Sequence, residues 1–107
     1  MADPCAPFNA AMDVLSRRWT GGIVRALLGG ASRFGEIRDA VPGITDAVLS
    51  TRLRELNERR LVRRQVREGP PAQVRYTLTA AGRDLEPVLD AIEAYGRRHR
   101  RLLSGGR

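Results

Sequence analysis

The hydrophobic periodicity of this chain changes abruptly near residue 61, and this change limits the folds that the chain can adopt. Over residues 45–60 the apolar side chains recur every three or four positions, which is typical of one face of a helix. Residues 61–67 and 73–78 instead alternate between apolar and polar side chains, as strands do. Between them, Glu-Gly-Pro-Pro-Ala at 68–72 cannot continue a strand ladder, so we expect a β-hairpin. The apolar face of the helix comprises Leu49, Leu53, Leu56 and the stem of Arg60.

Two further helices are predicted at the start of the chain. In residues 5–19 apolar side chains recur at helical spacing, which predicts an N-terminal helix with Cys5 at or outside its N-terminus. A second helix is predicted over residues 20–28, and the glycine pair that follows ends it. The apolar positions are Phe8, Met12, Leu15 and Trp19 in the first helix, then Ile23, Leu27 and Leu28 in the second.

A short third helix is expected after Ser32, its predicted N-cap, and Thr45 caps the helix of residues 45–60. The connection between these two helices is Val-Pro-Gly-Ile at 41–44, which has the length and the glycine of a helix-turn-helix turn.

The chain closes with a long helix predicted over residues 79–103, capped by Thr79. Pro87 lies inside this pattern and marks either a kink or a short break. The apolar positions of this helix are Leu85, Val88, Leu89, Ile92, Tyr95, Leu102 and Leu103.

This order of elements predicts a mainly α chain with a small β-hairpin (an α+β fold), namely a winged helix-turn-helix. We expect one domain over residues 1–107, with the helix-turn-helix at 32–60 and the wing at 61–78. In such a unit the second helix of the motif enters the major groove of DNA, and the hairpin reaches the flanking backbone or minor groove.

The distribution of charge agrees with this prediction. The chain has a net charge of +7, and all 19 of its basic residues are arginines. A net +4 falls within residues 44–82, which hold the predicted reading helix and the wing. Basic side chains gathered on these two elements indicate binding to double-stranded DNA. The all-arginine composition also fits a GC-rich coding bias, since arginine is equally frequent on the last helix.

Candidate DNA-binding residues follow from the helical wheel of residues 45–60. Arg54, opposite the apolar face, can donate two hydrogen bonds to a guanine edge. Arg52 points sideways, as either a phosphate clamp or a partner within the domain. The predicted set is Thr45, Ala47, Ser50, Thr51, Arg52 and Arg54 on the helix, with Arg63, Arg64, Arg67 and Arg75 on the hairpin.

The residue types argue against an enzyme. Cys5 is the only cysteine and His99 the only histidine, and the chain has no nucleophile–base pair and no glycine-rich phosphate loop. We therefore expect no catalytic residue, no metal and no cofactor. No apolar run approaches the ~18 residues that a membrane helix needs, and no signal peptide is apparent, so we expect a cytoplasmic protein without a membrane partner.

Several short strings also carry a family resemblance. They are Cys5-Ala6-Pro7-Phe8, Leu15-Ser16-Arg17-Arg18-Trp19, Ser32-Arg33-Phe34-Gly35-Glu36-Ile37, Pro42-Gly43-Ile44-Thr45, Leu49-Ser50-Thr51-Arg52-Leu53-Arg54-Glu55-Leu56, Leu61-Val62-Arg63-Arg64, and Val74-Arg75-Tyr76-Thr77-Leu78-Thr79 followed by Gly82 and Leu85. From about residue 5 to 103 the chain resembles the HxlR-type winged-helix transcriptional regulators. The resemblance implies a bacterial homodimer that binds DNA, with the N- and C-terminal helices forming the dimer interface.

Two positions depart from the family pattern. Family members commonly have the cysteine directly followed by proline, whereas Ala6 intervenes here. They often carry a basic residue where Ala47 stands, so DNA specificity does not carry over from relatives.

The resemblance also makes Cys5 a redox-sensing candidate, because a cysteine near the N-terminus of several relatives responds to electrophiles or oxidants. A thiol close to a helix N-terminus can react as a thiolate. Without a second cysteine in the chain, only modification by a small molecule or a bond between two subunits is available. The alternative is an inert thiol in an ordered or packed N-terminal segment.

The leading prediction is a sequence-specific regulator, a dimeric repressor that reads an inverted repeat and responds to electrophile or oxidative stress or to an unknown small ligand. Activation of transcription stays open. The alternatives are a protein-interaction winged-helix module and a largely non-specific architectural DNA binder, and the salt dependence of binding separates the first of these from a DNA reader.

Overall fold

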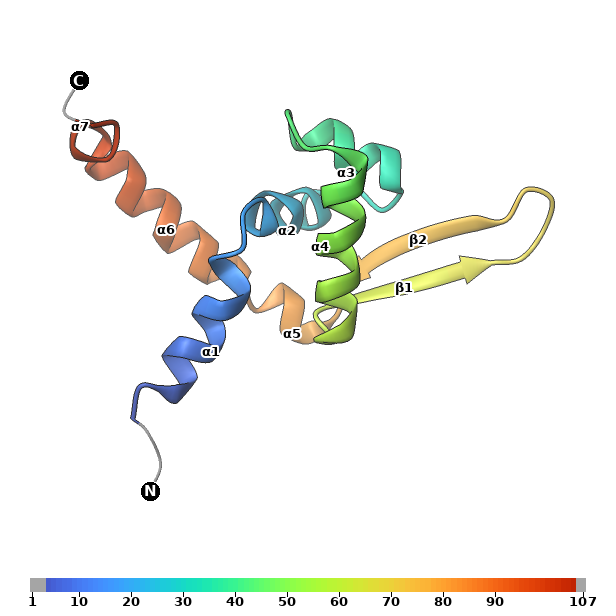
Figure 1. Cartoon of the computed structure of the whole chain (residues 1–107), viewed down its shortest axis with the longest axis horizontal. Coiled ribbons are helices and arrows are strands. Elements are labelled where there is room, and N and C mark those ends of the chain that lie inside the picture. The colour runs from blue at the N-terminus through green and yellow to red at the C-terminus, as the bar shows by residue number, and fades with distance from the viewer. Residues whose placement is uncertain (1–3, 106–107) are drawn as a thin grey trace.

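A computed structural model describes residues 4–105 of the chain and shows three central helices with arms on opposite sides (Figure 1). The hairpin extends to one side of the centre, and the first and the long C-terminal helices extend to the other. The elements are α1 (Ala6–Leu15), α2 (Thr20–Leu28), α3 (Phe34–Ala40), α4 (Asp46–Glu58), β1 (Val62–Arg67), β2 (Gln73–Leu78), α5 (Ala80–Arg83), α6 (Glu86–Arg98) and α7 (Arg100–Leu103). The predicted fold class, mainly helical with a two-stranded hairpin, is confirmed. Residues 1–3 and 106–107 of the predicted domain lie outside the described residues.

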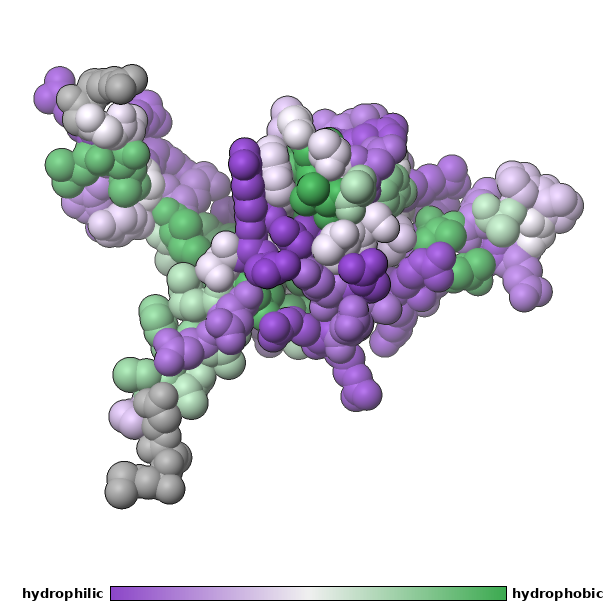
Figure 2. Space-filling view, in the orientation of Figure 1, coloured by the Kyte–Doolittle hydropathy of each residue, from purple (hydrophilic) through white to green (hydrophobic). Residues whose placement is uncertain are grey.

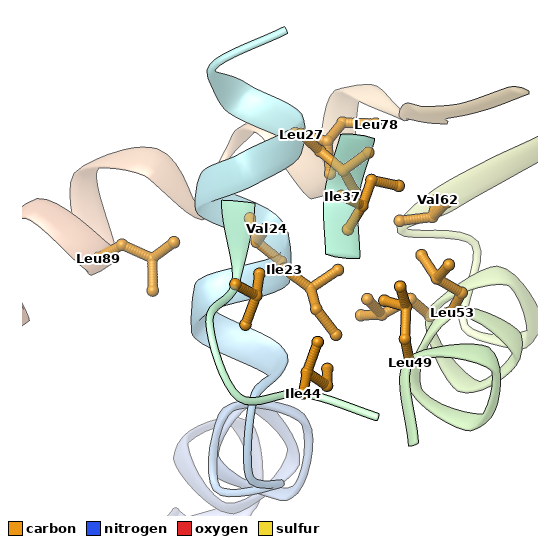
Figure 3. Close-up of a cluster of buried hydrophobic side chains, with 12 residues drawn as sticks. Ile23, Val24, Leu27, Ile37, Ile44, Leu49, Leu53, Val62, Leu78 and Leu89 are labelled. Atoms are coloured by element: carbon orange, nitrogen blue, oxygen red, sulfur yellow. The ribbon is translucent and has the colours of Figure 1, made fainter. Parts of the chain in front are cut away.

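The core lies between α2, α3, α4 and the base of the hairpin (Figure 3). All three leucines predicted for the apolar face of α4 are buried there. Burial of side chains of this size contributes about 1.5–3 kcal/mol each, so the core fixes α4 against α2 and α3. The buried apolar residues are Ile23, Val24, Leu27, Ile37, Val41, Ile44, Leu49, Leu53, Leu56, Val62, Leu78 and Leu89.

The wing is an antiparallel pair in which Val62 lies opposite Leu78 and Arg67 opposite Gln73. Its base is anchored twice, since the Tyr76 amide donates to the Ser32 carbonyl at 2.7 Å and the Thr79 amide donates to the Leu61 carbonyl at 3.0 Å. The strands are therefore held at the core end while the turn lies far from it (Figure 1).

Side-chain caps set the starts of two helices as predicted. The Thr45 hydroxyl accepts a hydrogen bond from the Val48 amide at 3.2 Å, and Thr79 does the same for Gly82 at 3.1 Å. Helix α3 begins one residue later than expected, with Arg33 rather than Ser32 as its N-cap. The reason is that the Ser32 carbonyl is bonded to the wing, while Glu36 accepts from the amides of both Ser32 and Arg33.

The predicted N-terminal helix over 5–19 is shorter, because α1 ends at Leu15. Trp19 adopts a left-handed backbone conformation (φ 78°), which interrupts the helix and starts α2 in a new direction. Trp19 is therefore not on the face of Phe8 and Met12, and instead it packs half-buried against the core.

The predicted C-terminal helix over 79–103 is divided into α5, α6 and α7. Pro87 lacks an amide proton and is compatible only with the first turn of a helix, so α6 starts at Glu86 after a break at residues 84–85. The prediction that the stem of Arg60 lies on the apolar face of α4 is also wrong. Helix α4 ends at Glu58, and Arg60 takes a left-handed conformation (φ 61°) with an exposed side chain.

The two arms on one side leave much apolar surface uncovered in the single chain (Figure 2). Phe8 on α1 is 67% exposed, and α6 keeps only Leu89 buried. The exposed apolar residues of the arms are Phe8, Met12, Val88, Ile92, Tyr95, Leu102 and Leu103. Within residues 4–105, no helix combines the length and the apolar character needed to cross a membrane.

Candidate nucleic-acid interface

Helix α4 presents a polar face to solvent on the side opposite its buried leucines. Ala47, Ser50 and Arg54 are exposed on successive turns of this face, and Thr51 is half-buried beside them. These four residues are brought together as the helical wheel predicts. The small side chains at the N-terminal end would let the helix backbone approach a groove closely. The long Arg54 side chain, further along the helix, could reach a base edge.

The turn before α4 fixes where that face begins. Val41 and Ile44 are buried on either side of Pro42-Gly43, and Gly43 has a positive φ of 92° that glycine adopts without strain. Across the turn, Nη1 of Arg38 on α3 lies 3.2 Å from Oδ1 of Asp46 on α4. Asp46 also complements the positive end of the α4 dipole, so the N-terminus of α4 is fixed by both packing and charge.

Two polar side chains of the α4 face already make local contacts. The Thr51 hydroxyl donates to the Ala47 carbonyl at 3.0 Å. Nε of Arg54 lies 3.8 Å from Glu58, and both of these side chains are largely exposed. An exposed pair of this kind contributes little, so the Arg54 guanidinium can exchange Glu58 for a base edge at small cost.

Arg52 differs from the other predicted residues of α4. Its Nε donates to the carbonyl of Arg18 at 3.0 Å and its Nη1 donates to Glu55 at 3.1 Å. Only 15% of the Arg52 side chain is exposed. The sequence leaves two roles open for Arg52, a phosphate clamp and a partner within the domain. These contacts are those of the second role.

The arginines of the wing are divided between its two faces. In the hairpin register Gln65 lies opposite Arg75, which places Arg63, Arg67 and Arg75 on one face. Arg64 lies opposite Tyr76 on the other face, the one that continues from buried Val62. All four arginines are exposed.

Arg75 also joins the wing to the start of α3, because its Nη1 donates to the Ser32 hydroxyl at 3.3 Å. Glu36 is nearby, and its pKa is lowered by the backbone hydrogen bonds from Arg33 and Ser32, with further lowering by the positive charges of Arg33 and Arg75. The carboxylate therefore stays ionised and secures the corner that holds the wing.

Figure 2 shows hydrophilic side chains gathered over α4 and along the hairpin, which also carries a small apolar patch, and apolar side chains on the two arms at the opposite side. Cys5 lies on α1, the arm opposite the hairpin, as the exposed N-cap of that helix (Figure 1). The structure thus separates the redox-sensing candidate from the two elements that are predicted to bind DNA.

Sequence reasoning missed Arg17, whose Nη2 lies 2.9 Å from Glu55 of α4. It also missed that Trp19 lies against the helix-turn-helix turn, since a Cβ added at Gly43 would lie 3.3 Å from Cη2 of Trp19. Both contacts join segments more than 20 residues apart, and no local spacing signals them.

Comparison with known proteins identifies the family of this chain. Residues 14–103 match the model of the HxlR-like helix-turn-helix family. The HTH-type transcriptional regulator YvaP of Bacillus subtilis is 40% identical over 94 residues, covering 88% of this chain and 87% of YvaP.

Solved structures give the same result. The redox regulator HypR in its reduced form has a TM-score of 0.83 at 35% identity, over 92% of this chain and 97% of HypR. Reduced YodB of Bacillus subtilis has a TM-score of 0.78 at 35% identity, over 92% of this chain and 95% of that one. YodB has also been solved after treatment with diamide, and that form has a TM-score of 0.75 over the same share of this chain.

Proposed function

Because this chain belongs to the HxlR-like helix-turn-helix family and is an HTH-type transcriptional regulator rather than an enzyme, we propose that it represses transcription by binding an inverted repeat in DNA as a homodimer. The observation that carries the proposal is the exposed polar face of α4, which lies beside an arginine-rich wing. Together these two elements match the major-groove and backbone contacts of a winged helix.

In this proposal the two elements have different tasks. Arg54 reads base edges from the exposed face of α4, with Ala47, Ser50 and Thr51 in close approach to the groove. The Thr45 hydroxyl, whose oxygen accepts from the Val48 amide, donates its proton to a backbone phosphate from the N-cap position. The wing arginines at 63, 64, 67 and 75 neutralise phosphates, which supplies affinity without sequence information.

The apolar surface of α1, α6 and α7 supports the dimer. Isolated exposed apolar residues are ordinary, but here seven large ones gather on the arms opposite the wing. A second copy of the chain would cover them in a two-fold contact, as the symmetry of an inverted repeat requires. Two recognition helices related in this way reach half-sites about 10 base pairs apart, or a small multiple of that distance.

Cys5 supports a redox response as a finer part of the proposal. YodB has been solved after diamide treatment, and HypR is described as a redox regulator with an oxidised form. Cys5 is exposed at the start of α1, within the proposed dimer surface. If two subunits join through Cys5, two thiols lose two protons and two electrons to an oxidant such as diamide and form one disulfide.

A salt titration of binding tests the function most simply. We expect log Kd for operator DNA to rise steeply and linearly with log salt, and random DNA to compete only weakly. A flat salt dependence would instead indicate a protein-binding winged helix, and equal competition by random DNA would indicate an architectural binder. For the redox response, operator affinity that falls equally in wild type and Cys5→Ser after diamide would remove Cys5 from the mechanism.

A further inference from the structure

Glu55 on α4 lies between two arginines and uses both of its carboxylate oxygens. Oε2 is 2.9 Å from Nη2 of Arg17, and Oε1 accepts a hydrogen bond from Nη1 of Arg52 at 3.1 Å. Arg17 belongs to the turn that joins α1 to α2, and Arg52 lies one turn before Glu55 on α4. We call these three residues the Glu55 brace.

The brace is shielded at its centre. The Arg52 side chain is 15% exposed and that of Glu55 is 31% exposed, so their hydrogen bond is partly protected from water. Arg52 also donates from Nε to the Arg18 carbonyl at 3.0 Å, which ties the backbone of the α1–α2 turn to α4. Charge-assisted hydrogen bonds of this kind fix geometry more firmly than neutral ones do.

The same turn touches the helix-turn-helix at a second point. Trp19 directly follows Arg18 and lies over Gly43, where an added Cβ would be 3.3 Å from the Trp19 ring. The α1–α2 turn therefore contacts the helix-turn-helix at two points, Gly43 just before α4 and Glu55 within α4.

Helix α1 packs against the core through its last two residues, Val14 and Leu15, which are half-buried. No residue of α1, which lies wholly within the described part of the chain, is buried. Its large apolar side chains, Phe8 and Met12, face solvent in the single chain. The direction in which α1 leaves the body is thus set at its C-terminal end, by Val14 and Leu15 on the core and by the residues 16–19 turn that the brace holds.

We propose that the Glu55 brace sets the distance and angle between the two α4 helices of the dimer, and with them the half-site spacing that the protein accepts. The inference rests on the proposed function, because it takes α1 as part of the dimer surface. One added base pair moves a half-site by about 3.4 Å and rotates it by about 35°. A dimer whose two α4 helices are firmly positioned loses affinity when the half-site spacing changes. A dimer with a loosened connection between α1 and α4 binds both spacings with similar affinity.

The experiment measures affinity for the selected operator and for versions with one or two base pairs added or removed between the half-sites. Arg17→Ala removes one ion pair of the brace, and Glu55→Gln removes the charge on which both ion pairs depend. Arg59→Ala is the matched control, because Arg59 is exposed at the end of α4 and makes no ion pair within residues 4–105. A single half-site and the thermal midpoint are measured in parallel.

We expect wild type and Arg59→Ala to prefer the selected spacing by at least about fivefold. Arg17→Ala and Glu55→Gln should lose most of this preference, while their affinity for a single half-site and their thermal midpoint change little. Arg17→Lys, which keeps a cation opposite Glu55, should recover part of the preference, a result that a general loss of stability would not give.

Two results would overturn the inference while leaving the proposed function intact. One is an unchanged spacing preference in Arg17→Ala and Glu55→Gln, and the other is a wild-type protein that binds its operator with no preference for spacing. A wild-type protein that fails to bind any selected DNA would overturn the proposed function itself.

Discussion

Gln65 and Arg75 lie directly opposite each other across the hairpin, and this position assigns every arginine of the wing to a face. Arg63, Arg67 and Arg75 share a face with polar neighbours, whereas Arg64 lies on the face that continues from the core. Four arginines that look equivalent in the sequence are therefore separated into three and one.

Removal of an arginine from the polar face of the wing should weaken DNA binding evenly across sequences. For Arg67→Ala and Arg63→Ala we expect the slope of log Kd against log salt to fall by about one each, because each change removes one phosphate contact. Arg64→Ala should have a smaller effect. Arg98→Ala on α6, an exposed arginine outside both reading elements, is the control. Equal effects of the Arg63 and Arg64 variants would contradict the assignment of faces.

Arg54→Ala should lower operator affinity by about 1–3 kcal/mol and relax base preference at one position of each half-site. Its ion pair with Glu58, at 3.8 Å and exposed, is weak, so the free energy of unfolding should hardly change. A panel of operators with single base substitutions checks this, with Arg59→Ala as the control. A variant with wild-type affinity and preference would show that Arg54 is not a reader.

Gly82 should not tolerate any side chain. A Cβ at this buried position would lie 2.1 Å from the Leu61 carbonyl oxygen, which is backbone and must move. We expect Gly82→Ala to destabilise the protein by several kcal/mol, at the upper end of single substitutions. Gly96→Ala is the matched control, since a Cβ there meets nothing within 4 Å and should stabilise α6 by about 0.5–1 kcal/mol. Denaturant unfolding of the two variants measures both effects, and similar midpoints would contradict this packing.

Glu36 should contribute to stability at neutral pH and lose that contribution in acid. Its pKa in the folded state is lowered, first by the hydrogen bonds from the amides of Arg33 and Ser32. A group with a lowered folded pKa stabilises the protein above its unfolded pKa, and the contribution disappears as the pH falls through the folded value. Glu36→Gln should therefore have a lower thermal midpoint than wild type at pH 7, and the difference should narrow toward pH ~3. A constant difference across this range would show that charge on Glu36 does not matter.

Ile92→Asp should dissociate the proposed dimer without unfolding the chain. Ile92 is an exposed apolar residue on α6, so the change costs little within one subunit but places a charge in an apolar interface. We expect sedimentation to show a monomer and operator affinity to fall, while affinity for a single half-site is retained. A variant that remains dimeric would place the interface elsewhere.

The sequence predicts those parts of the fold in which local pattern and tertiary packing agree. Leu49, Leu53 and Leu56 are buried as expected because one helical face meets one core, and Thr45 caps α4 where a hydroxyl precedes a periodic run. The hairpin is found for the same reason, since alternation and a Gly-Pro-Pro turn are both local signals.

The remaining features depend on contacts between distant residues. Trp19 fits the spacing of the N-terminal helix, yet its left-handed backbone and its contact with Gly43 come from packing across the helix-turn-helix. The helical wheel leaves Arg52 as either a phosphate clamp or a partner within the domain, and the structure shows that its Nε donates to the Arg18 carbonyl, 34 residues earlier. Helical periodicity specifies faces, but it does not say which face meets which partner.

Selection of bound DNA from a random pool, followed by sequencing, shows whether a dimer reads DNA through α4. We expect an inverted repeat whose half-sites are about 10 base pairs apart or a small multiple of that distance, and a pool from Arg54→Ala that loses one base preference in each half-site. A bound pool without a repeated motif, or one with the same preferences for wild type and Arg54→Ala, would contradict the claim that a dimer reads DNA through α4.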